Sequence, residues 1–205
     1  MGGPYRVPAT ASTAELREQG SVFLAALRAA ADEAEARAVL GEIAALHPDA
    51  THHCWASRLG PEPARERAAD AGEPRGTAGE PILRALRGAG LSDCVCVVSR
   101  WFGGTKLGKG GLARAYAEAA RQAIAGTSTL ERAPTVELEL TAAYDAVGAI
   151  KRLVRPPQIE LVAESYGELA TLRLRVWRER EAELRAELAA FSSRIETVDA
   201  RRSGR

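Results

Sequence analysis

The sequence predicts an α+β protein of two domains. Segments with strand-like and helix-like apolar spacing alternate along the chain, and small and polar residues interrupt this periodicity at 126–134. The 205 residues, 46% of them apolar, suffice for one large core or two small ones. We therefore expect a flexible leader without periodicity at residues 1–20, a first domain at 21–133 and a second at 134–205.

The first half of the first domain is expected to alternate strands and helices. Residues 22–27 are a continuous apolar run typical of a buried strand, and Asp32 can cap a helix that ends near Leu46. A short strand is expected at residues 54–59. Residues 60–76, rich in proline, glycine and charge, predict a long mobile loop.

The second half of this domain centres on a strand that we expect to be covered on both faces, because residues 94–98 are all apolar. Before it, Thr77 and Glu80 have the spacing of a capping box at the start of a helix that ends near Gly88. After it, a glycine-rich turn leads into a helix over residues 111–125.

The second domain shows the order strand, helix, two strands, helix, strand. Alternating apolar residues predict its strands, and a helix that carries Val147 and Ile150 stops at Pro156. The last helix carries Leu184, Leu188 and Phe191 on one side. This order is the split-βαβ, ferredoxin-like arrangement, which by itself implies no function.

Charge and cysteine content narrow the class of protein. The formal net charge of +1 gives no global attraction to nucleic acid or membranes, so any electrostatic site has to be local. Of the three cysteines, Cys94 and Cys96 lie in an apolar run, which argues against a disulfide framework and for a reducing compartment. No signal-peptide core or membrane-length apolar stretch is present, so we expect a cytoplasmic protein.

Residues 99–114, between a predicted strand and a predicted helix, carry the densest functional signal. Five glycines permit unusual backbone conformations and close approach, and the amide groups that open the helix form an anion site. Residues 94–117 include no acidic residue. They include four basic ones: Arg100, Lys106, Lys109 and Arg114.

Two phosphate motifs nearly match this segment. Gly103 and Gly108-Lys109 have the spacing of a nucleotide-binding P-loop, but Gly110 stands where a Mg²⁺-binding hydroxyl is required. Residues 108–113 satisfy the permissive dinucleotide fingerprint, yet no acidic residue closes a second strand at the required distance. The plain alternative is that the glycines turn the chain and let the helix pack on the sheet.

Other candidate chemistry is weaker. His52, His53 and Cys54 could suggest a metal, but adjacent histidines in an extended segment point to opposite faces and no second cluster completes a ligand set. Asp70 and Glu73 lie in a charged segment where solvated carboxylates are the usual explanation. We therefore predict no metal, no cofactor and no catalytic set.

Residues 97–116 closely resemble the signature of the Impact/YigZ family, V-T-R-Y-F-G-G-x-K-L-G-x-G-G-L-x-R-A-Y. Residues 52–60 and 70–83 are similar to two further family segments, H-x-C-Y-A-Y-R-I-G and D-D-G-E-P-S-G-T-A-G-x-P-I-L. The chain departs from this pattern at Ala71 and Arg75, where the family has Asp and Ser. The missing aspartate argues against carboxylate catalysis, whereas Arg75 extends the basic surface.

The resemblance implies a first domain with the βαβ fold of a small-subunit ribosomal protein and of a domain of elongation factor G. It also implies a second domain similar to the last domain of that factor. Eukaryotic relatives bind a ribosome-associated activator of a translation-control kinase, and nucleic-acid binding has been proposed for bacterial relatives. The resemblance therefore implies a non-catalytic protein linked to translation.

Three functions are consistent with these residues. The first is binding of RNA or the ribosome, with the amides of Gly108, Gly110 and Gly111 and a set of basic side chains on phosphate. That basic set is Arg58, Arg75, Arg100, Lys106, Lys109 and Arg114. Five further residues are possible contacts: His52, His53, Glu73, Trp101 and Phe102.

The other two functions use the same segment differently. Trp101 and Phe102 could form an aromatic hot spot for a protein partner such as a translation factor. An enzyme acting on a phosphorylated small molecule, with Glu73 or His53 as base, would require a deep pocket between the glycine-containing loops.

Overall fold

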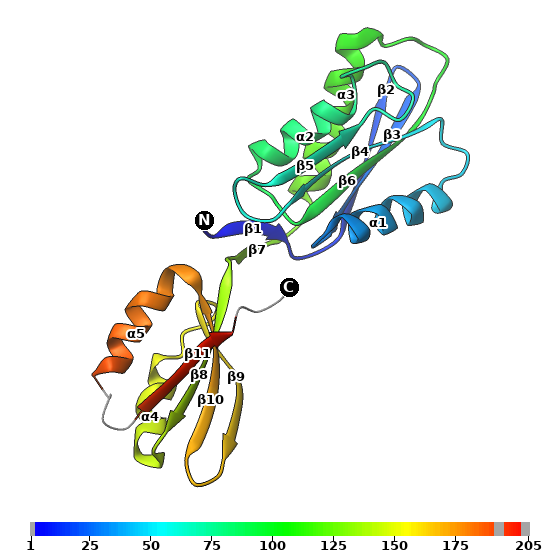
Figure 1. Cartoon of the computed structure of the whole chain (residues 1–205). Coiled ribbons are helices and arrows are strands. Elements are labelled where there is room, and N and C mark those ends of the chain that lie inside the picture. The colour runs from blue at the N-terminus through cyan, green and yellow to red at the C-terminus, as the bar shows by residue number, and fades with distance from the viewer. Residues whose placement is uncertain (1–2, 191–194, 202–205) are drawn as a thin grey trace. The chain divides into compact units, whose positions relative to one another are not determined.

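The computed structural model of the chain describes residues 3–190 and 195–201. The chain forms two compact units, Met1–Arg132 and Ala133–Arg205, which we call unit 1 and unit 2 (Figure 1). Each unit combines one main sheet with helices, so the predicted α+β class with two domains is confirmed. No helix within the described ranges is long and apolar enough to cross a bilayer.

Unit 1 is built on a five-stranded antiparallel sheet of order β2-β3-β6-β4-β5. Its strands are β2 (Ser12–Glu18), β3 (Ser21–Ala29), β4 (His52–Leu59), β5 (Arg65–Ala69) and β6 (Cys94–Trp101). Its helices are α1 (Glu33–Leu46), α2 (Gly79–Gly88) and α3 (Gly108–Ala125). A separate two-stranded ribbon joins β1 (Tyr5–Pro8) to β7 (Thr129–Arg132).

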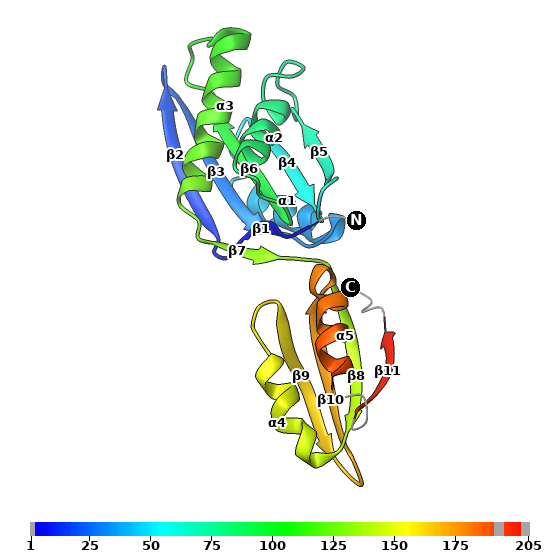
Figure 2. The ribbon, with the colours of Figure 1, turned by 90° about the vertical axis from the view of Figure 1, so that its left-hand side faces the viewer.

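The sheet of unit 1 lies between two helical layers (Figure 2). On the central strand β6, Cys94, Cys96 and Val98 belong to the core shared with α2 and α3, while Val95 and Val97 contact the α1 side. All five are fully buried. The prediction of a strand covered on both faces is therefore confirmed.

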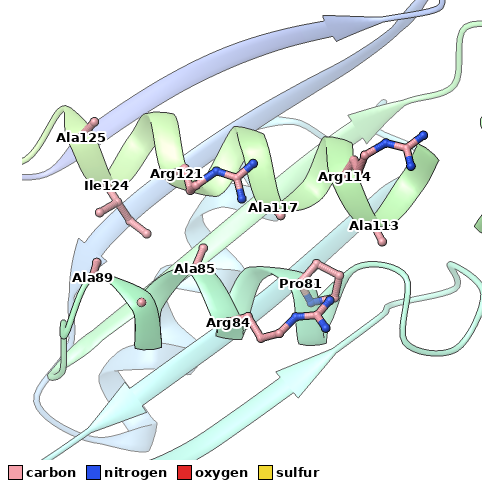
Figure 3. A pocket seen from close by; sticks show the side chains of 11 residues that line it. Pro81, Arg84, Ala85, Ala89, Ala113, Arg114, Ala117, Arg121, Ile124 and Ala125 are labelled. Carbon is pink, nitrogen blue, oxygen red and sulfur yellow. The ribbon is translucent and has the colours of Figure 1, made fainter. Parts of the chain in front are cut away.

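Helices α2 and α3 run side by side in the same direction on one face of the sheet. The chain enters β6 from α2 and leaves it toward α3, so both helices begin at the end of the sheet where β6 ends. Pro81 lies beside Ala113 at one end of the pair, and Ala89 lies beside Ile124 at the other (Figure 3). The positive ends of two helix dipoles therefore point toward the same end of the unit.

Two predictions about unit 1 are wrong. A flexible leader was predicted at residues 1–20, but the described part of it, residues 3–20, contains β1 and β2, and β2 pairs with β3 along its whole length. Its short apolar face, Ala14 and Leu16, packs against the main core. Residues 60–76 likewise contain the edge strand β5 in place of a continuous loop.

Unit 2 is a four-stranded antiparallel sheet of order β11-β8-β10-β9, which confirms the predicted ferredoxin-like arrangement. Its strands are β8 (Thr135–Ala142), β9 (Ile159–Tyr166), β10 (Ala170–Trp177) and β11 (Ile195–Arg201). Its helices are α4 (Tyr144–Leu153), the short η1 (Arg178–Arg180) and α5 (Glu181–Ala189). Leu184 and Leu188 are buried as predicted, and Phe191 lies outside the described residues.

Candidate functional site

The basic glycine-rich loop, residues 102–111, connects β6 to α3 and continues into the first turn of that helix. Helix α3 begins at Gly108, three residues before the predicted start, so the last glycines are helical. Its first turn has no acidic residue and no side chain caps its amides. Exposed or partly exposed positions line this end: Lys106, Gly108, Lys109, Gly110, Gly111 and Arg114. Uncapped helix amides and lysine side chains are groups that favour an anion.

A close backbone contact fixes this loop to the turn between β2 and β3. A Cβ atom on Gly103 would lie 1.9 Å from the carbonyl carbon of Gly20. The Gly103 N–H also donates to Ser21 Oγ at 3.2 Å, and the Phe102 N–H donates to Thr51 Oγ1 at 3.2 Å. Gly103 thus serves close packing, as the plain alternative for these glycines expects.

Arg100 was expected on the basic surface, but it is only 5% exposed and its charge is paired. Its Nη1 donates to Glu73 Oε1 at 2.6 Å and its Nη2 donates to Ser21 Oγ at 3.2 Å. The guanidinium carbon lies 5.3 Å from the ring centroid of Phe23 and 5.5 Å from that of Phe102. Arg100 therefore joins the loop to the core and is not free to bind phosphate.

Glu73 extends this contact into a buried polar chain made of Arg100, Glu73, Tyr116 and Cys54. The Tyr116 hydroxyl donates to Glu73 Oε1 at 2.8 Å, and Cys54 Sγ donates to the Tyr116 hydroxyl at 3.3 Å. Burial raises the pKa of Cys54 to about 12 and raises the pKa of Tyr116 above its usual range. Both groups stay protonated at neutral pH. The buried polar chain therefore holds loops together and supplies no nucleophile.

Asp70 is an intramolecular cap and not the solvated carboxylate that the sequence suggested. Its carboxylate accepts from the N–H groups of Gly76 at 2.7 Å, Ala78 at 3.0 Å and Gly79 at 2.9 Å. Although burial opposes ionisation, these three amides hold the pKa of Asp70 below its usual value.

The predicted capping box is therefore wrong, because the Thr77 hydroxyl donates to the Pro74 carbonyl instead. The two parallel helices differ as a result. The amino terminus of α2 faces the Asp70 carboxylate, whereas that of α3 faces the solvent-exposed lysines.

Arg58 does not belong to the site. It is 4% exposed, and it pairs with Glu62 and with Glu66 at 2.9 Å. Arg58 lies opposite Cys94 in the β4–β6 register, while His52 lies opposite Arg100, so Arg58 is at the other end of the sheet. The prediction that it contacts phosphate beside the loop is wrong.

The remaining predicted residues differ in exposure and in their contacts. Arg75 is exposed in the segment before α2. His52 Nδ1 lies 2.9 Å from the Ala71 carbonyl, and His53 Nδ1 lies 2.8 Å from Ser99 Oγ. Burial, with nearby His47, lowers the pKa of His53. Both histidines are therefore already engaged within the unit.

The two aromatic residues of the loop differ in their availability. Trp101 Nε1 donates to Asp49 at 2.8 Å and its ring contacts His47 edge to face, so this side chain is held. Phe102 is 48% exposed and presents its ring to solvent. Phe102 is therefore the aromatic side chain that a partner can reach.

The geometry gives little support to a catalytic or metal centre. A cavity of about 750 Å³ lies between α2 and α3, and neither Glu73 nor His53 lines it. Within residues 3–190 and 195–201, no group of three or more potential ligand side chains could hold a metal ion. The sequence did not reveal the buried polar chain, although a buried Tyr116 hydroxyl needs a partner and could have pointed to it.

Comparisons with known proteins agree with this arrangement. Residues 19–124, most of unit 1, match the family described as the Impact N-terminal domain. IMPACT family member YigZ of Escherichia coli K12 is 32% identical over 190 residues, which cover 92% of this chain and 93% of that protein. An IMPACT family member from Thermus thermophilus is 42% identical over 142 residues, covering 69% and 76%.

A solved structure has a similar fold over nearly the whole chain. The crystal structure of a hypothetical protein is 31% identical, with a TM-score of 0.68, and covers 97% of this chain and 98% of its own. Fold and site therefore define a two-domain α+β protein whose first domain is of the Impact type. The chain belongs to the Impact family.

Proposed function

We propose that this protein is a non-catalytic regulator linked to translation that binds RNA or the ribosome through the basic glycine-rich loop. One observation carries the proposal: exposed Lys106 and Lys109 stand beside the uncapped amino terminus of α3. Cationic side chains and helix amides are the groups that bind backbone phosphates without reading base sequence. Membership of the Impact family supports the link to translation.

The exposed ring of Phe102 adds a second kind of contact. An aromatic side chain beside a basic groove can stack on unpaired bases, whose faces are accessible in single strands. Because Arg100 lies beneath this ring at 5.5 Å and is anchored by Glu73, the ring is presented from a supported position. We therefore expect single-stranded RNA to bind better than a duplex of the same length.

The engaged state of the candidate acid–base groups supports a non-catalytic role. Glu73 is 8% exposed, and one of its oxygens already accepts from both Arg100 and Tyr116. A general base needs access to the proton that it removes from a substrate. A carboxylate buried in this way holds neighbouring side chains in place and is not accessible to a substrate.

The test compares the purified protein with Lys106→Ala/Lys109→Ala for binding to ribosomes and to labelled single-stranded RNA at low and physiological salt. We expect salt-sensitive binding, and a slope of log K against log salt that is smaller by about 1.4 in the variant, because two phosphate contacts are lost. The control is Arg37→Ala/Arg65→Ala, which removes the same charge from exposed positions on α1 and β5. Absence of binding to both targets, or an equal loss in the control, would contradict the proposal.

The exposure of Phe102 also favours a second candidate, a protein-interaction surface for a translation factor. When an aromatic hot-spot side chain in a protein interface is truncated, the complex loses affinity, and the loss depends little on salt concentration. Ribosome binding that is lost in Phe102→Ala at every salt concentration, and kept in the double lysine variant, would favour this candidate over RNA.

A further inference from the structure

A groove runs along the outer side of unit 1 between the parallel helices α2 and α3 (Figure 3). Its volume is about 750 Å³. Its floor is made of small side chains, among them Ala85 from α2, Ala89 at the end of that helix, and Ala113 and Ala117 from α3. We call it the helix groove. It shares none of its lining residues with residues 102–111.

Arginines on both helices border the helix groove, and it has no acidic lining residue: Arg84 belongs to α2, while Arg114 and Arg121 belong to α3. In the described part of the chain, Arg84 and Arg114 form no ion pair, although Arg121 donates to Glu118 Oε2 at 2.6 Å. The nearby Glu80 is engaged by Arg87 at 3.1 Å. The borders therefore carry unbalanced positive charge.

An apolar floor between cationic borders favours a ligand that combines an apolar surface with negative charges on both sides of it. Alanine methyl groups offer neither a stacking surface nor hydrogen bonds to bases, so a nucleic acid would gain only its phosphate contacts. A protein helix can instead lay small apolar side chains on the floor and carboxylates on the borders. We propose that the helix groove docks an acidic amphipathic helix of a partner protein.

The spacing of the arginines defines the expected pattern of that helix. Arg114 and Arg121 are seven residues apart on α3, which is about 10.5 Å along the axis. In a docked helix aligned with α3, carboxylates at positions i and i+7 would lie opposite Arg114 and Arg121. A carboxylate on its other flank faces Arg84, and the ten residues of α2 limit the docked length to about three turns. This docking shares Arg114 with the basic set proposed for RNA, but it uses neither Lys106 nor Lys109.

The test uses a fluorescein-labelled peptide of about twelve residues, built from Ala and Leu on one helical stripe with Glu on both flanks. Its control peptide carries Lys in place of each Glu. Binding to the full chain is measured by fluorescence polarisation, and the contact is located by amide chemical shifts in the ¹⁵N-labelled protein. We expect the Glu peptide to bind, and shifts to concentrate at residues 84–89 and 113–121.

Two variants separate charge from shape. Arg84→Glu reverses a border charge, and Ala117→Phe fills the floor of the groove. We expect each substitution to weaken peptide binding about tenfold. The control Lys106→Ala/Lys109→Ala should leave peptide binding unchanged. Far-UV circular dichroism checks that both groove variants fold. Failure of the Glu peptide to bind, equal binding of the two peptides, or native affinity in both variants overturns the proposal. Loss of single-stranded RNA binding in Arg84→Glu, with peptide binding kept, would assign the groove to nucleic acid instead.

Discussion

The two units of this protein bury different kinds of side chain. Among the described residues, every buried charged residue, namely Arg58, Glu73, Asp93 and Arg100, lies in unit 1. The core of unit 2 is apolar, and its charges pair across the exposed face of its sheet, as Arg173 does with Glu139 at 3.2 Å. Buried charges are costly unless they are paired, so their concentration in unit 1 needs a reason beyond stability.

That reason is the positioning of loops. The Arg100–Glu73 pair and its extension to Tyr116 join three segments that are distant in sequence: the end of β6, the loop before α2 and the middle of α3. Two of the three segments, β6 and α3, flank the basic glycine-rich loop in the sequence. Unit 2 has an ordinary apolar core and no comparable junction among its described residues.

The largest expected effect comes from removing one member of the buried pair. Glu73→Ala leaves the Arg100 guanidinium buried without its counter-ion, which we expect to lower the free energy of unfolding by about 3–5 kcal/mol. Urea unfolding in a Trp177→Phe background checks this, because the two remaining tryptophans report on unit 1.

The matched control is Glu139→Ala in unit 2, which breaks an exposed pair and should cost at most about 1 kcal/mol. Its unfolding is followed by circular dichroism. Equal effects of the two substitutions would remove the contrast between the units.

A smaller effect is expected where two backbones touch. In Gly103→Ala the new methyl group would overlap Gly20. The backbone has to move apart to remove the overlap, which should displace the loop and lower the free energy of unfolding by about 1–3 kcal/mol. In Gly110→Ala the nearest atom to the added methyl is Arg114 Nη1 at 3.6 Å, so the helix should gain up to about 1 kcal/mol. Thermal unfolding of both variants tests this, and destabilisation of similar size in both would be inconsistent with a contact specific to Gly103.

The smallest effect concerns the cap on α2 and depends on pH. Asp70→Asn should lower stability by about 1 kcal/mol at neutral pH, because the charged acceptor of three amides is lost. The pKa of Asp70 is lower in the folded protein than its ordinary value of 3.8. Its contribution is therefore complete above that value and disappears as the pH falls through the lowered folded value.

Urea unfolding at several pH values checks this expectation. The difference between the native protein and Asp70→Asn should stay constant from about pH 7 to pH 5 and shrink below about pH 4. A difference that grows on acidification would show that Asp70 is not stabilised as the anion.

Long apolar patterns in the sequence predicted most of the fold. The helix capped by Asp32, the buried strand at residues 94–98 and the ferredoxin-like order of elements in unit 2 were all recognisable. The strands β1, β2, β5 and β7 were missed because they are short or lie at a sheet edge, with few apolar residues to mark them. Pairing with a neighbour, which the local pattern does not reveal, determines their structure.

The candidate site was predictable only in part. The glycines and lysines of the loop lie where sequence reasoning placed them, at a strand-to-helix connection. Counting charges could not show that Arg100 meets Glu73, since the two are 27 positions apart and come together only through the sheet. The same limit applies to Arg58, which meets its carboxylates in a loop and an edge strand that were not anticipated.

The ribbon of β1 and β7 brings the two chain ends of unit 1 together. Tyr5 is the direct partner of Arg132 in that ribbon, and Pro8 is the partner of Thr129. A chain whose ends meet in this way can be closed into a ring by a few added residues. It can be reopened between β4 and β5, where Glu62 and Pro63 are exposed, with every strand pairing preserved. Unit 1 is therefore suited to circular permutation, and to insertion as a single module into a surface loop of another protein.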